Sequence, residues 1–487
     1  MKKLLTLAVC VISLQVSAQE KNEKWDLIKC VNYARENNIS LKQADIQARI
    51  SALQLKQAKL NQYPNASLSS GLGMQLGRSI DRTTNVYSNT QAIYQNFGVN
   101  SSIGVYNWGR LKNAYAVAQF NAEAALVDID KAANDLALNV ATYYLQVLSA
   151  KEQININELQ ASQTLAQVDI TRKQVDAGAL PELNLVELEA QLATDSSNII
   201  SAKSLYQQNI LSLKGLLNID AAQSFDIVTP PVETIPVEPI ASLNPELVYN
   251  IALNTQPLQK ADSLRIKAAQ KNILVTRASM YPNITFGLSL STNFYNSFKN
   301  ITGATFGGYS PVTGAESVVN IGGTNYFVQS PIYKLTQSNK SFAQLWNGYG
   351  DQLTNNFGQG FGFNFSVPIF NNGQYRINYE QSKLSYQNQL LQKRADDQTL
   401  KLNIYTAYTN AVSALEKFNA GIKGVASSQK AYDFAKKRYD VGLLSTLDLI
   451  TNENNLLRAK LQQVANQFDY VFKMKVLEYY KGLGLRL

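Results

Sequence analysis

The sequence predicts a mainly α-helical fold that carries strands of a membrane β-barrel, built twice on one helix–β-hairpin–helix plan. Three observations lead to this prediction: an internal repeat, four alternating strand segments and two long helical runs without proline. The repeat keeps an offset of 264 residues, so that "LNVATYY" at 138–144 matches "LNIYTAY" at 402–408. One offset shared by many positions indicates duplication. We therefore expect structural repeats over 19–228 and 246–487, joined by a proline-rich linker at 229–245.

Residues 1–18 are expected to be a secretory signal peptide. Lys2 and Lys3 precede the short apolar run "LLTLAVCVISL", and "VSA" offers small residues for cleavage after Ala18. This run is too short to cross a bilayer as a helix. Lipid attachment favours a small residue before the cysteine, whereas Cys10 follows Val9, so the sequence disfavours a lipid anchor.

Helices begin and end each repeat. The first helical stretches, at 27–61 and 241–280, stop at a Tyr-Pro pair because proline disfavours helix in the residue before it. Apolar residues then recur at helical spacing over runs that span roughly 100 Å at about 1.5 Å per residue. Helices of this length belong in a coiled coil or bundle. The predicted helical hairpins occupy 110–217 and 374–480, with long arms at 110–176 and 374–440 and returning arms at 182–217 and 446–480.

Four segments alternate between apolar and small polar residues, which predicts strands near 66–77, 97–107, 283–292 and 359–369. In "NITFGLSLS", Ile284 and Phe286 share one face, whereas Thr285 and Gly287 share the other. A soluble sandwich is the alternative, but a face of Ser, Gly and Asn suits a water-filled lumen, and about ten residues suit a tilted bilayer crossing. Four strands are too few to close a barrel, so several subunits must contribute.

Two segments between these strands are expected to be loops. The first hairpin loop reads "GRSIDRTTNVYSNTQAIYQNFGVN" over 77–100, and a longer polar loop covers 293–358. A loop as long as the second is usually functional or mobile.

The composition disfavours catalysis, bound metal and nucleic acid. The chain has no histidine, and Cys30 is the only cysteine beyond the signal peptide. A lone cysteine without histidine is a poor nucleophile, and the commonest metal ligand is absent. The formal net charge of +9 is scattered over helical segments, which is typical of solvated faces. We therefore expect no catalytic, cofactor or metal site, and no nucleic-acid partner.

The chain resembles TolC-like outer-membrane efflux proteins over nearly all of its expected mature length. The resemblance is carried by the duplicated plan, the Tyr-Pro strand entrances, and the turn "VGLLSTLDL" with its weaker copy "AGALPELNL". It implies a homotrimer in the bacterial outer membrane, in which each subunit gives four strands to a shared barrel. A long α-helical barrel would extend into the periplasm, where it would meet an adaptor protein and an inner-membrane pump of the RND or ABC type.

The resemblance also implies the sites. The two turns between helical arms would form the tunnel entrance and dock the adaptor. The docking residues would be Asp176, Gly178, Leu180, Leu183, Asp440, Gly442, Leu444, Thr446 and Leu447. Asp448 corresponds to an acidic residue that rings the closed entrance in the family, so the implied gate residues are Asn184, Glu187, Asp448 and Thr451. A plain helix-start acid, stabilised by the helix dipole, is the alternative for Asp448.

Three functions remain open from the sequence. The first is a passive exit duct of a tripartite efflux or type I secretion system, without enzymatic activity. The second is a trimeric coiled-coil adhesin or tether in the outer membrane. The third, an outer-membrane hydrolase, lacks a histidine base.

Overall fold

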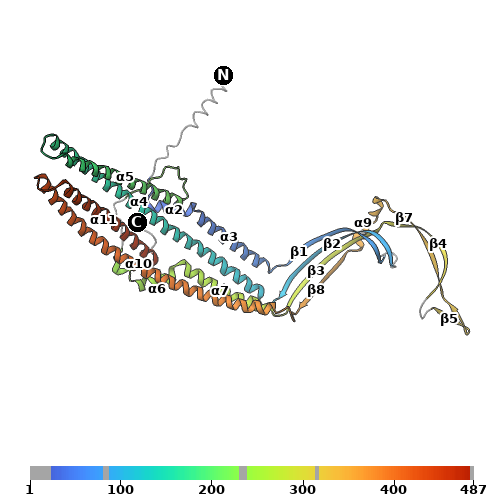
Figure 1. The fold of residues 1–487 in the computed structure, drawn as a ribbon. Helices are drawn as coiled ribbons and strands as arrows, with labels where there is room; N and C mark the ends of the chain where they lie inside the picture. Colours follow the sequence, from blue (N-terminus) through green and yellow to red (C-terminus); the bar gives the residue numbers. More distant parts are fainter. Residues whose placement is uncertain (1–23, 81–86, 230–237, 313–316, 483–487) are drawn as a thin grey trace, which may run out of the picture. The chain divides into compact units, whose positions relative to one another are not determined.

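The computed structural model describes residues 24–80, 87–229, 238–312 and 317–482. These residues form two compact units (Figure 1). The helical unit contains the chain up to Lys56, Tyr115–Ile273 and the chain from Glu380; the strand unit contains Gln57–Ala114 and Leu274–Tyr379. The predicted signal peptide at 1–18 lies outside the described residues, as do residues 230–237 of the expected linker.

The helices repeat with the offset that the sequence indicates. α4 (Arg110–Asp176) and α10 (Gln374–Asp440) both have 67 residues. Their returning partners α5 (Glu182–Leu217) and α11 (Thr446–Lys481) both have 36 residues. The bounds of each pair differ by 264 residues, so the predicted helical hairpins and their duplication are confirmed.

The first helical stretch of each repeat consists of two helices. The helices are α2 (Leu27–Asn37), α3 (Ile39–Leu60), α6 (Pro245–Thr255) and α7 (Pro257–Ala278). The break at Asn38 has extended backbone, and its side-chain oxygen accepts from the backbone N–H of Ser40. The matching break at Gln256 precedes Pro257, which disfavours helix at that residue.

The helical unit has two larger hydrophobic clusters, and the first also includes Phe468 and Val471 of α11. In the first, Tyr144 and Leu213 pack with Cys30 beneath α2. In the second, Ile404 of α10 packs against Met474 of α11 and Val248 of α6. Short amphipathic helices therefore cover the middle of the long hairpins, where burial of apolar area stabilises them.

The strand unit contains a four-stranded antiparallel sheet in the order β1-β2-β3-β8. The strands are β1 (Asn65–Ile80), β2 (Tyr87–Tyr106), β3 (Asn283–Ser297) and β8 (Gly358–Ser366). Within the described part of the sheet, β1 and β8 each pair on one side only. The register puts Leu68, Val99, Leu290 and the β8 phenylalanines on one face, which remains largely exposed.

Both expected loops contain regular structure, so those two predictions are wrong. Most of 77–100 belongs to the extended β1 and β2, where Asn, Ser and Gln lower the hydrophobic contrast that marks a strand. The described part of the 293–358 segment contains the end of β3, two two-stranded ribbons and two short helices. These elements are β4 (Lys299–Pro311), β5 (Val318–Ile321), β6 (Thr324–Phe327), β7 (Gln329–Asn339), α8 (Phe342–Leu345) and α9 (Tyr349–Asn355).

Candidate functional site

The turns that join the helical arms have the same backbone geometry. Gly178 and Gly442 follow α4 and α10 with φ of 71° and 74°, a left-handed conformation that glycine adopts without steric cost. Each glycine N–H donates to the carbonyl three residues before it, at 2.9 Å. The next N–H, of Ala179 or Leu443, donates to the carbonyl five residues before it, at 2.8 Å. This is the Schellman arrangement, which satisfies the last carbonyl groups of the helix.

The predicted docking residues differ in their access to solvent. Asp176, Leu183, Asp440 and Leu447 are exposed, whereas Leu180 and Leu444 are half-buried. Thr446 is buried, so it does not present its side chain at the surface. The sequence interpretation missed Val441 and Leu443, which flank Gly442 and are 68% and 69% exposed. The sequence could have indicated these two residues, because apolar side chains on both sides of a turn glycine, without a neighbouring core, are unusual.

The predicted gate residues lie on the first two turns of α5 and α11. Asp448 accepts a hydrogen bond from the Ser445 hydroxyl at 2.7 Å, and its backbone N–H donates back to Ser445 at 3.1 Å. Asp448 therefore takes part in the cap of α11, as the simpler interpretation expects. Thr451 is exposed and donates to the Leu447 carbonyl, whereas Asn184 and Glu187 are half-buried.

Polar side chains join the two helical hairpins close to these turns. Gln167 of α4 donates to the Tyr432 hydroxyl of α10 at 3.1 Å. One helical turn further along α4 and two turns further along α10, the Thr171 and Tyr439 hydroxyls lie 3.3 Å apart. Four residues from the two long arms thus connect the repeats.

Two buried carboxyl groups lie in the same region. Asp195 of α5 is 1% exposed and accepts hydrogen bonds from Thr164 and Gln191. Glu453 of α11 is also 1% exposed, but both of its carboxylate oxygens lack a hydrogen bond of normal geometry.

The surroundings of Glu453 set its proton affinity. Burial raises the pKa of Glu453 above its usual range, and the Asp195 carboxylate adds to the rise. The Gln160 and Gln167 amides and the Lys436 ammonium oppose it. The neighbouring Tyr432 has its pKa raised to about 12, first by burial and then by Glu453.

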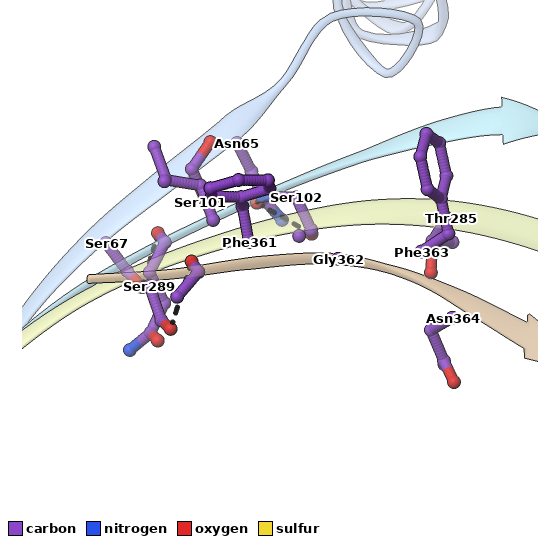
Figure 2. A pocket seen from close by; sticks show the side chains of 14 residues that line it. Asn65, Ser67, Ser101, Ser102, Thr285, Ser289, Phe361, Gly362, Phe363 and Asn364 are labelled. Atoms are coloured by element: carbon purple, nitrogen blue, oxygen red, sulfur yellow. Dashed lines mark hydrogen bonds between the residues drawn. The ribbon is translucent and has the colours of Figure 1, made fainter. Parts of the chain in front are cut away.

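The face of the sheet opposite the apolar residues is polar and hollowed. The residues that line the hollow include Ser67, Asn100, Ser102, Ser289 and Asn364 of this face, together with Leu288, Phe361 and Phe363. Figure 2 shows Phe361 and Phe363 on one side of β8 and Asn364 on the other. Each strand thus separates a polar face from an apolar one, as the alternation predicts.

The described residues offer little for chemistry. Cys30 is fully buried, and burial raises the pKa of its thiol to about 12, so it remains protonated. Within the described ranges, His, Cys, Asp and Glu side chains form no group of three or more suited to a metal ion. No described helix combines the length and apolar composition needed to cross a membrane.

The family described as "Outer membrane efflux protein" matches residues 30–218 and 335–472. The chain belongs to this family. As an outer membrane efflux protein, it is a TolC-like transport channel located in the outer membrane. The resemblance drawn from the turn and strand motifs is therefore confirmed.

Curated relatives and solved structures agree with this assignment. The pyoverdine export outer membrane protein OpmQ of Pseudomonas aeruginosa is 23% identical over 82% of this chain and 73% of its own length. The outer membrane protein TolC of Escherichia coli is 20% identical over 69% of this chain and 59% of its own. The structure of VceC from Vibrio cholerae has a TM-score of 0.71 at 15% identity, covering 94% of this chain and 97% of VceC. The Campylobacter jejuni CmeC outer membrane channel has a TM-score of 0.68 at 19% identity, covering 94% and 85% of the two chains.

Proposed function

We propose that this channel is the exit duct of a tripartite efflux or type I secretion system, and that it works as a homotrimer. Each subunit contributes four strands to one barrel and two helical hairpins to a tunnel that crosses the periplasm. The duct is passive and has no enzymatic activity. Energy comes from an inner-membrane pump of the RND or ABC type, which reaches the duct through a periplasmic adaptor.

One observation supports the shared barrel most strongly: the sheet is amphipathic and open at β1 and β8. Its apolar face carries Phe361 at 80% exposure, which water disfavours and lipid accommodates. Its polar face suits an aqueous lumen. Unpaired edges carry unsatisfied backbone groups, and pairing β1 of one copy with β8 of the next removes all of them at once.

The two glycine turns are the proposed docking sites for the adaptor. A helix of 67 residues places its ends about 100 Å apart, so each turn lies far from the other end of its long arm. Leu183, Val441, Leu443 and Leu447 expose apolar surface there, as a hydrophobic interface requires. The fixed backbone of each turn holds these side chains in place with little entropic cost on binding.

The proposed gate lies just inside these turns. In a trimer, three copies of Asp448 would approach one axis, with Thr451 one helical turn further along and Asn184 and Glu187 at the matching positions of the first repeat. Like charges near an axis repel and attract cations. Asp448→Asn should therefore change the block of conductance by divalent cations, and identical current traces for both proteins would remove Asp448 from the gate.

A planar bilayer recording tests the duct directly. Purified protein should form steady channels and migrate as a trimer in detergent. A trimer without conductance would instead support the adhesin or tether. A stable monomer that needs no detergent would contradict both functions.

Variants at the tip of the second helical hairpin, the turn between α10 and α11, test the docking. Leu447→Asp should abolish export in cells and cross-linking to the co-purifying adaptor, because it places a charge on the apolar interface, while trimer amounts stay normal. Leu447→Met keeps the apolar surface and is the matched control. Leu447 is preferable to Leu444, which is half-buried against Tyr432 and Leu449 and would disturb the fold of the tip. Normal export by Leu447→Asp would contradict docking at this turn.

A further inference from the structure

The short helices α8 and α9 pack on one face of β2 and β3. The Tyr349 hydroxyl donates to Gln95 at 2.7 Å, and the Asn296 amide donates to the Leu345 carbonyl at 2.8 Å. Thr292 donates to the Leu353 carbonyl at 2.6 Å. Five hydrophobic residues of this segment and its neighbours, Leu345, Trp346, Tyr349, Leu353 and Phe298, surround Ile93 and Phe294. The contact therefore buries apolar side chains and also contains hydrogen bonds.

The covered face is the apolar face of the sheet. By register, Phe294 lies on the same side of β3 as Leu288 and Leu290, and Ile93 lies on the same side of β2 as Val99. Phe294 is 0% exposed beneath the helices, whereas Phe363 on this face of β8 is 62% exposed. On β2 and β3 the apolar face is thus bare along one part and covered along the other, whereas on β1 it stays exposed at Met74 (58%) and Leu76 (67%). The boundary falls at the paired residues Phe97 and Thr292.

The length of the bare part matches a bilayer. From Asn283 to Thr292, β3 has about ten residues, which extend about 33 Å along the strand and roughly 25 Å across the membrane at the usual tilt. The hydrocarbon band of membrane β-barrels is about 25 Å tall. The helices therefore begin where the acyl chains would end.

Aromatic clusters mark both ends of this bare part. At one end, the Trp108 ring lies 5.2 Å from Tyr106 and 5.1 Å from Tyr281, and its indole N–H donates to the Pro282 carbonyl. At the other end, Trp346 stacks on Phe294 with ring centroids 5.6 Å apart, and Phe342 beside it is 75% exposed. Tryptophan and tyrosine favour the two membrane–water interfaces, because their rings are apolar and their N–H or O–H groups are not.

We propose that α8 and α9 form a collar on the lipid-facing side of the strands, with Phe342 and Trp346 at the headgroup level of the outer leaflet. The partner of this surface is the membrane lipid. The proposal rests on the channel proposed above, which directs the apolar face to lipid. It gives α8 and α9 a position outside the pore wall, on the face opposite the polar lumen.

Tryptophan fluorescence tests the collar, because the chain contains three tryptophans, Trp25, Trp108 and Trp346. Full-length Trp25→Phe/Trp108→Phe retains only Trp346, and Trp25→Phe/Trp346→Phe retains only Trp108. Both are reconstituted in phosphatidylcholine vesicles brominated at a shallow or a deep acyl position. Trp346 should be quenched several-fold more by shallow than by deep bromine, and little by aqueous iodide.

The outcomes separate the collar from the channel. If Trp108 is quenched by brominated lipid and Trp346 only by iodide, the collar is refuted and the channel stands. If neither is quenched by lipid, the strands lie outside the membrane and both proposals fail. Should the double variants not assemble, an NBD fluorophore on Phe342→Cys replaces Trp346, since the fully buried Cys30 does not compete for the label. Its emission should shift to the blue in vesicles, and an unshifted spectrum would refute the collar.

Discussion

The side chains of Gln191 and Asn454 exchange two hydrogen bonds and so join α5 of the first repeat to α11 of the second. Each amide nitrogen donates to the carbonyl oxygen of the other residue, at 3.2 and 3.1 Å. Gln191 also donates to the buried Asp195. Together with the contacts of Tyr432 and Tyr439, this pair holds the two hairpins in one arrangement near their turns.

Gln191→Ala should loosen the hairpins. Two hydrogen bonds between the hairpins, of about 0.5–1.5 kcal/mol each, are lost together with the bond to Asp195 within α5, so separation of the hairpins should become easier by about 1–3 kcal/mol. Hydrogen exchange of the α5 and α11 backbone near the turns should accelerate, and conductance should rise. Gln462→Ala is the control, because Gln462 bonds only to Asn466 of the same helix, at 2.9 Å. If both variants exchange at the same rate, the pair does not hold the hairpins together.

Glu453→Gln should stabilise the contact between the hairpins at neutral pH. The folded pKa is raised above the ordinary value of 4.5, so the stabilisation is complete below about pH 4.5 and is lost as pH rises through the raised pKa. Glutamine has the same shape as glutamate but carries no charge, so the variant does not lose stability as pH rises. A buried polar group without a hydrogen bond costs about 1–3 kcal/mol, which sets the size of the expected gain. Between pH 4 and 8, the thermal unfolding temperature of the natural chain should fall as pH rises, and that of the variant should change less.

The equivalent residue of the first repeat provides the comparison for Glu453. Glu189 occupies the same position of the first repeat, but it is half exposed and pairs with Arg172 at 2.8 Å. Glu189→Gln is therefore the matched substitution, because it removes a carboxyl group from the equivalent exposed position. A variant of Glu453 with the slope of the natural chain would show that the buried carboxyl does not titrate in this range.

Gly178→Ala and Gly442→Ala should each destabilise their turn by about 1–2 kcal/mol, because a side chain disfavours the left-handed backbone. Open space surrounds both positions, so the cost comes from the backbone alone. Gly424→Ala is the control, since it lies inside α10, also in open space, and should stabilise the helix by about 0.5–1 kcal/mol. Limited proteolysis at the turns measures the difference. Equal cleavage of the three variants would contradict the role assigned to the glycines.

Ser445→Ala should weaken the first turn of α11 by about 1 kcal/mol, because it removes the side-chain acceptor for the Asp448 N–H. Ser445→Asn preserves an acceptor and should restore the natural stability. Hydrogen exchange at Leu447–Leu449 reports the change. No difference between the two variants would mean that the cap contributes little in the assembled tip.

The sequence predicted the features that depend on local pattern. Residues 110–176 and 374–440 carry uninterrupted helical periodicity, and both helices have those bounds. The sheet faces followed from alternation, as Phe361 and Gly362 illustrate. Gly178 and Gly442 marked the turns because a helix reversal favours a residue with positive φ.

Features that depend on tertiary contact were out of reach. Glu189 and Glu453 occupy equivalent positions, yet one is exposed and the other buried, because only the second faces the other hairpin. The same holds for α8 and α9, whose apolar residues find their partners on β2 and β3. Thr446 was expected at the docking surface, but the returning helix buries it.

The open edges of β1 and β8 have a consequence for biogenesis. A newly exported copy would cross an aqueous compartment with two unpaired strand edges and an exposed apolar sheet face. A single chain should therefore aggregate unless a chaperone binds it. Insertion and joining with two further copies must then follow one another closely. The yield of assembled channels should therefore increase more than linearly with the concentration of newly exported chains.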